Sequence, residues 1–158
     1  AVSASARIYQ AFPRQDVATA GHGWSVGQAD LDAVRFIDQD AQGQAYTVLA
    51  NQSVSAAAVS QYGFKRYAGD VFYYPLPTGG PLYALFLDAI RQPNRDIVRE
   101  AAELGKSGLV YVVINAYWDH AEERIEAYRA IADKSWNAPQ ENIYVFRFDF
   151  NASSRAAK

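Results

Sequence analysis

The chain of 158 residues contains no cysteine and no methionine. Without cysteine it cannot form disulfides, cysteine-ligated zinc sites or a thiolate nucleophile. It also lacks any run that approaches the ~20 apolar residues of a membrane-spanning helix. Because the sequence begins at Ala1 rather than Met, we expect either a cleaved signal segment or excision from a longer protein.

The chain also has no large excess of charge of either sign, because 15 basic and 17 acidic residues leave a formal net charge of −2. Proteins that bind nucleic acids usually present a strongly basic surface, so no nucleic-acid partner is expected. What the chain does have is a large apolar fraction, 50% hydrophobic and 14% aromatic residues. This composition excludes a disordered chain and suits a single globular domain.

Three segments are predicted along the chain. Residues 1–24 are rich in small and polar residues and predict a linker or a strap. Residues 25–150 predict a single α/β domain, because apolar residues recur there with helical spacing and in short β-type runs. Residues 151–158 predict a flexible tail.

Helices alternate with strands in this domain. The patterns predict helices at residues 25–40, 54–61, 81–90, 94–104 and 119–134, and strands at 45–50, 71–74, 109–114 and 143–150. Such alternation favours a three-layer α/β sandwich with a mostly parallel sheet of about four strands. Residues 143–150 have one aromatic face and one mixed face, which predicts an edge or terminal strand whose direction stays open.

Polar residues follow two of the predicted strands. Asn51, Gln52 and Ser53 come after residues 45–50, and Asn115, Trp118, Asp119 and His120 come after residues 109–114. Ligands in open α/β sheets bind beyond the carboxyl ends of the strands, so these seven residues form a candidate ligand-binding set if the two strands are neighbours. The alternative, which we favour, is that Ser53 and Asp119 are ordinary helix caps.

No complete catalytic or metal-binding set is present in the sequence. The neighbours Asp119 and His120 suggest an acid/base couple, but adjacent helical residues face different directions. A metal site would need a third ligand, and the other histidine, His22, lies in the predicted linker. We therefore predict no catalytic residue, no metal and no cofactor.

Residues 73–77, Tyr-Tyr-Pro-Leu-Pro, allow two interpretations. They form either an exposed aromatic, proline-rich surface for a partner or glycan, or a strand end packed on the core.

A resemblance covers roughly residues 28–58, where the helix pattern GQADLDAVRFI, which starts at Gly27, leads through the strand YTVLA into NQSVSAAA. These segments resemble the soluble, extracytoplasmic C-terminal domain of polytopic GT-C-type membrane glycosyltransferases, including oligosaccharyltransferase-like proteins. In that family the catalytic acids lie in the membrane part, so the resemblance implies none here. The family signature W-W-D-Y-G is only half met by YWDHA at residues 117–121, where Trp118 and Asp119 match it and Tyr117, His120 and Ala121 depart from it.

The resemblance implies a non-catalytic soluble module of a membrane-anchored envelope protein. Such a module is extracytoplasmic, membrane-tethered or secreted, and contacts the membrane domain of its own chain, a glycan or a protein partner. Two alternatives remain. One is a secreted interaction or assembly subunit that uses the aromatic, proline-rich surface, and the other is a small enzyme with a polar pocket at the strand ends.

Overall fold

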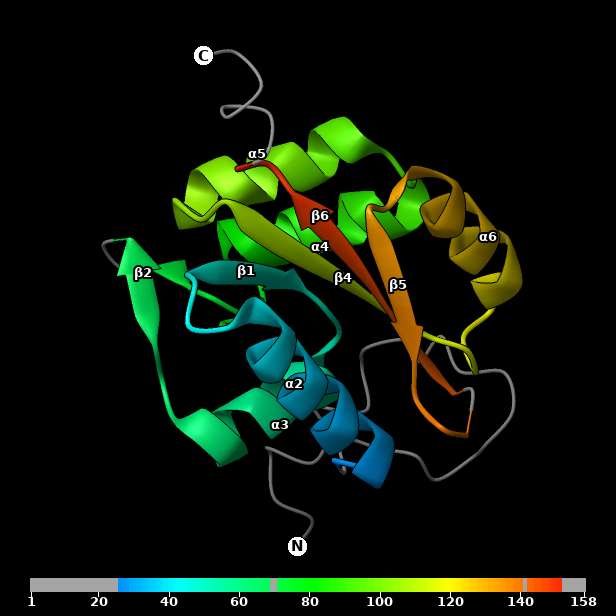
Figure 1. Ribbon diagram of the computed structural model, residues 1–158, viewed down its shortest axis with the longest axis horizontal. Coiled ribbons are helices and arrows are strands. Elements are labelled where there is room, and N and C mark those ends of the chain that lie inside the picture. Colours follow the sequence, from blue (N-terminus) through cyan, green and yellow to red (C-terminus); the bar gives the residue numbers. More distant parts are fainter. Residues whose placement is uncertain (1–25, 69–70, 141, 152–158) are drawn as a thin grey trace, which may run out of the picture.

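The computed structural model describes residues 26–68, 71–140 and 142–151, and shows an α/β fold (Figure 1). A four-stranded sheet has the order β1-β4-β6-β5. Its strands are β1 (Tyr46–Leu49), β4 (Leu109–Asn115), β6 (Ile143–Asp149) and β5 (Lys134–Asn137), and a separate pair consists of β2 (Arg66–Ala68) and β3 (Val71–Phe72). The helices are α2 (Gln28–Ala41), α3 (Gln52–Tyr62), α4 (Pro81–Arg91), α5 (Arg95–Gly105) and α6 (Ala121–Ile131). The predicted linker, residues 1–24, and residues 152–158 of the predicted tail lie outside the described residues.

The main sheet is mixed, so the prediction of a mostly parallel sheet is wrong. Strands β1 and β4 run parallel, with Val48 opposite Tyr111. Strand β6 is antiparallel both to β4 and to β5. The physical reason is the short connection formed by residues 138–142, which allows a hairpin between β5 and β6 but is too short for a crossover between parallel strands.

Strand β5 is the element that the sequence pattern misses. The predicted helix at residues 119–134 ends at Ile131, and the chain then forms β5 at one edge of the sheet. Three of its four side chains, Lys134, Ser135 and Asn137, are exposed, so the strand has no apolar alternation to reveal it. Because β5 takes the edge, β6 lies inside the sheet rather than at its border as predicted.

Two further boundaries differ from the predictions. The strand predicted at residues 71–74 is reduced to β3, which pairs with β2 outside the main sheet. The first helix begins at Gln28 after Gly27, whose N–H donates to the Asp30 carboxylate at 2.8 Å, whereas the predicted start at Ser25 lies outside the described residues.

Helices pack against both faces of the sheet, around two apolar clusters (Figure 1). Helices α2 and α3 cover the face that carries Val48, Val113 and Val145. Helices α4, α5 and α6 cover the face that carries Val112 and Phe146. Since both faces are covered, all seven residues of β4 are buried, which explains its continuous apolar run.

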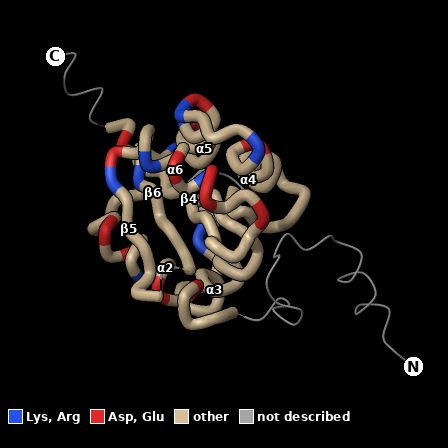
Figure 2. The backbone as a smooth tube through the Cα atoms, turned by 90° about the vertical axis from the view of Figure 1, so that its right-hand side faces the viewer, with Lys and Arg blue, Asp and Glu red and all other residues tan. Residues whose placement is uncertain are grey.

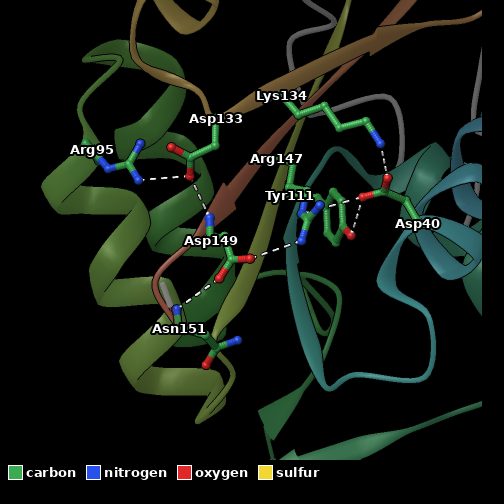
Figure 3. A network of polar contacts seen from close by, with 8 residues as sticks. All are labelled: Asp40, Arg95, Tyr111, Asp133, Lys134, Arg147, Asp149 and Asn151. Atoms are coloured by element: carbon green, nitrogen blue, oxygen red, sulfur yellow. Dashed lines mark hydrogen bonds and ion pairs between the residues drawn. The ribbon is translucent and has the colours of Figure 1, made fainter. Parts of the chain in front are cut away.

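A charged network lies toward the amino ends of β1 and β4 (Figure 3). The Asp40 carboxylate pairs with Lys134, accepts a hydrogen bond from the Tyr111 hydroxyl at 2.9 Å and lies 3.6 Å from Arg147 Nε. We call the following set the charged network: Asp40, Arg95, Tyr111, Asp133, Lys134, Arg147, Asp149 and Asn151. It joins the end of α2 to β4, β5 and β6. Elsewhere acidic and basic residues are interspersed along the backbone (Figure 2).

Candidate functional site

Strands β1 and β4 end at the same edge of the sheet because they are parallel neighbours. There Asn51 Nδ2 donates a hydrogen bond to Asn115 Oδ1 at 2.9 Å, and both side chains are buried. The two polar segments therefore meet, as the sequence predicted for neighbouring strands.

Asn51 is also the N-cap of α3. Its backbone is extended and its Oδ1 accepts a hydrogen bond from Val54 N at 3.0 Å, which satisfies one of the unpaired N–H groups at the helix start. The favoured interpretation named Ser53 as the cap, and this is wrong because Ser53 lies inside the helix. The polar side chain at the strand end thus holds α3 as well as β4.

Ser53 connects this pair to α2. Its Oγ lies 2.9 Å from Asn51 Oδ1 and 3.1 Å from Asp30 Oδ1, and its single proton can be donated to one of them at a time. Asp30 is 5% exposed and lies in the first turn of α2, where the helix dipole stabilises its negative charge. Nothing in the helical pattern of residues 28–41 indicates that the Asp30 carboxylate reaches α3.

Tyr117 completes the group, since its hydroxyl accepts a hydrogen bond from Asn115 Nδ2 at 3.0 Å. Burial raises the pKa of Tyr117, the charge of Asp30 raises it further, and the hydrogen bonds with Ser53, Asn51 and Asn115 offset only part of this increase. The phenol therefore stays neutral at physiological pH. We call these five residues the polar edge cluster: Asp30, Asn51, Ser53, Asn115 and Tyr117.

The remaining predicted residues lie outside this cluster. The side chain of Gln52, at the first position of α3, is partly exposed and forms no hydrogen bond with the described residues. Trp118 packs toward α4, with its ring centroid 6.0 Å from that of Phe86. Asp119 and His120 are exposed in the turn before α6. The structure therefore brings together Asn51, Ser53 and Asn115 of the seven predicted site residues. The other four lie outside the polar edge cluster.

Asp119 is not a helix cap, so this second interpretation is also wrong. The N-cap of α6 is His120, which has a positive φ of 55° and makes no side-chain capping bond. Its imidazole Nε2 lies 3.5 Å from the Asp119 carboxylate, and its Nδ1 lies 3.7 Å from that of Glu123. The side chains of Asp119 and His120 are 67% and 62% exposed, so water screens these contacts.

Metal ligands do not gather at this edge either. Across the residues that the structure describes, no group of three or more His, Asp or Glu side chains is placed to hold a metal ion.

The aromatic part of the stretch 73–77 belongs to the core, whereas Pro77 at its end is exposed. Tyr73 and Tyr74 are fully buried, Pro75 is buried, and the Tyr73 ring contacts those of Tyr46 and Tyr74 edge to face. Their burial excludes the exposed aromatic surface and supports the strand end packed on the core.

Comparisons with known proteins give no further identification: no protein-family model, no curated protein and no solved structure matches this chain. Within residues 26–68, 71–140 and 142–151, no helix has both the length and the apolar character needed to cross a membrane.

Proposed function

We propose that this chain is a non-catalytic α/β module of a membrane-anchored envelope protein, glycosyltransferase-like, that contacts a substrate or a partner. The buried hydrogen bond between Asn51 and Asn115 is the observation that carries the non-catalytic part. It joins the two segments that could otherwise supply an active site at the strand ends. We also infer a three-layer arrangement, supported by the apolar clusters on the two sheet faces.

The polar edge cluster supports a structural role because its members bond to one another. Asn51 bonds to Asn115 and Val54, and Asn115 bonds to Tyr117 as well. Each such bond that a reacting substrate displaced would leave a buried polar group unsatisfied, at a cost of about 1–3 kcal/mol. This cost favours a fixed cluster over one that opens during turnover.

The sequence resemblance supports the envelope part of the proposal. Residues 28–58 contain α2, β1 and α3, which follow one another in the chain and contribute to the same apolar cluster.

Cell fractionation tests the membrane-anchored part. The native gene product, tagged at its carboxyl end, is expected in the membrane fraction and should be cleaved by protease added outside intact cells or spheroplasts. Recovery of the whole product in the soluble cytoplasmic fraction would contradict the proposal.

A turnover assay tests the non-catalytic part. The purified chain is incubated with nucleotide-activated and lipid-linked sugars, and products are measured by mass spectrometry, with Asp119→Ala as the comparison. We expect no product from either protein. Turnover by the native chain that Asp119→Ala abolishes would establish the enzyme alternative instead.

A further inference from the structure

Four tyrosine rings lie in contact near the amino end of β1. The Tyr46 ring centroid is 5.8 Å from that of Tyr111 and 5.3 Å from that of Tyr73, and the Tyr73 and Tyr74 centroids are 4.7 Å apart. Each of the four side chains is at most 2% exposed. We call Tyr46, Tyr73, Tyr74 and Tyr111 the tyrosine cluster. Tyr46 contacts rings on two sides and therefore lies at its centre.

Two hydroxyls of the tyrosine cluster donate to carboxylates of α2. The Tyr46 hydroxyl donates to Asp38 Oδ1 at 3.0 Å, and the Tyr111 hydroxyl donates to Asp40 Oδ2 at 2.9 Å (Figure 3 shows the second pair). A carboxylate can take up a proton as well as accept a hydrogen bond. The two phenols therefore each have a base in direct contact with the O–H group.

The base matters because the Tyr46 phenol keeps its proton at physiological pH. Burial raises the pKa of the Tyr46 hydroxyl above its ordinary value, and the charges of the neighbouring tyrosines and of Asp38 raise it further. Removing an electron from a phenol makes its O–H group strongly acidic, so the proton must leave when the electron does. A positioned proton acceptor accelerates such steps by about 10²–10⁴-fold.

The two carboxylates differ in how strongly cations hold their negative charge. Asp40 faces two cations, since it pairs with Lys134 and lies 3.6 Å from Arg147 Nε. Among the described residues, Asp38 forms an ion pair with Lys65 alone, at 3.6 Å. Cations stabilise the ionised carboxylate and make it a weaker base. Asp38 is therefore the better proton acceptor of the two.

The composition directs oxidation toward aromatic side chains. The chain has no cysteine and no methionine, whose sulfur atoms are readily oxidised, but it has 11 tyrosines and 3 tryptophans. The partly exposed Tyr62 connects the tyrosine cluster to the surface, because Lys65 Nζ lies 4.7 Å from the Tyr62 ring centroid and 5.6 Å from that of Tyr73. An electron can thus leave the buried cluster without a solvent channel.

We propose that Tyr46 and Asp38 form a site of one-electron oxidation by small oxygen-centred radicals, such as the carbonate radical. The carbonate radical takes one electron from the Tyr46 phenol and becomes carbonate. The phenol O–H bond breaks, and its proton passes to Asp38 Oδ1. The products are a neutral tyrosyl radical, a protonated Asp38 and carbonate. This inference goes beyond the proposed function, because it concerns a stoichiometric reaction of the chain itself.

Peroxynitrite in bicarbonate buffer tests the site, because it releases the carbonate radical together with nitrogen dioxide, which adds to tyrosyl radicals and forms nitrotyrosine. Peptide mass spectrometry of the intact chain after treatment measures nitration at each tyrosine. Tyr128 is the internal control, since it is also buried but donates its hydroxyl to the Ala89 carbonyl at 2.7 Å, which is not a base. We expect about tenfold more nitration at Tyr46 than at Tyr128.

Asp38→Asn removes the base and keeps the shape of the side chain. Nitration of Tyr46 should fall about tenfold in this variant, with circular dichroism to confirm that it is folded. Asp32→Asn is the matched control, because Asp32 also lies on α2 but accepts a hydrogen bond from Gln28 Nε2 at 2.8 Å instead of from a tyrosine. This control should leave the nitration of Tyr46 unchanged.

Nitration that follows exposure would overturn the inference, with the partly exposed Tyr83 and Tyr144 most modified and Tyr46 no more than Tyr128. Equal nitration of Tyr46 in the native chain and in folded Asp38→Asn would overturn it as well. The comparison within the native chain decides the matter even if Asp38→Asn does not fold. Membrane fractionation and turnover, on which the proposed function depends, are separate measurements.

Discussion

The polar edge cluster and the charged network lie toward opposite ends of the β1–β4 pair, and they hold the fold by different means. The polar edge cluster centres on two buried amides, Asn51 and Asn115, and contains a single carboxylate. The charged network joins α2 to β5 and β6 through ion pairs and to β4 through the hydrogen bond of the Tyr111 hydroxyl, and the side chain of Lys134 is 52% exposed. Burial makes the first region costly to break, whereas exposure makes the second responsive to pH and salt.

Asn115→Ala tests the buried region and should have the largest effect. The change removes the acceptor of the Asn51 amide and one of the hydrogen bonds of the Tyr117 hydroxyl, and it creates a small cavity. The free energy of unfolding should therefore fall by about 3 kcal/mol. Urea denaturation at several salt concentrations measures the free energy of unfolding, and the loss caused by Asn115→Ala should be the same at every salt concentration. A loss below about 1 kcal/mol would show that water replaces the amide.

Asp40→Asn tests the charged region. The Asp40 side chain is 8% exposed and pairs with Lys134 and Arg147, so removing its charge should lower the free energy of unfolding by about 1–2 kcal/mol at neutral pH. The loss should shrink at high salt, where the ion pairs of the native chain are screened. The matched control is Asp88→Asn, in an exposed pair with Arg91, which should change stability little.

The pH dependence of unfolding should separate the two regions. Burial alone would raise the pKa of Asp40, but hydrogen bonds from Lys134 and Tyr111, and the charges of Lys134 and Arg147, lower it overall. The pKa of Asp133 is lowered as well, because the hydrogen bonds that its carboxylate accepts from Arg95 and from the Asp149 N–H outweigh the effect of burial.

Carboxylates with a lowered pKa in the folded state stabilise it above their unfolded pKa, and this stability is lost as the pH falls through the folded pKa. Native stability should therefore decrease below about pH 4. Asp40→Asn should flatten this decrease, whereas Asn115→Ala should keep the native profile at lower overall stability. Identical profiles for native protein and Asp40→Asn would contradict the assignment.

Tyr117→Phe should have the smallest effect. It removes one hydroxyl from the polar edge cluster and keeps the ring, so about 1 kcal/mol of stability should be lost. Hydrogen exchange should become faster in residues 116–120, because that turn loses its bond to Asn115. Unchanged exchange there would mean that the backbone bonds of the turn are sufficient to hold it.

Sequence patterns were informative where burial is continuous. The runs that became β1 and β4 are buried on both faces, so their apolar character revealed both the strands and the polar edge they share. The two faces of β6 were also predicted correctly, because Val145 and Phe146 alternate between the two apolar clusters.

Patterns failed where tertiary contacts decide the outcome. Strand β5 is formed by pairing with β6 and by Trp136 stacking on Phe36, neither of which leaves a periodic signal. Asp30 and Tyr117 joined the candidate site through contacts between separate elements. A single sequence contains no sign of such contacts, since both residues also suit ordinary turns and helix starts.

The exposed edge strand β5 bears on how the protein behaves at high concentration. Open strand edges can recruit a second chain, and short length, lysine and a nearby proline all oppose this. Strand β5 is four residues long, begins with Lys134 and is soon followed by Pro139. Replacing Lys134 with valine and Pro139 with threonine would leave an uncharged strand edge without a proline. We expect such a variant to form fibrils when it is shaken at high concentration.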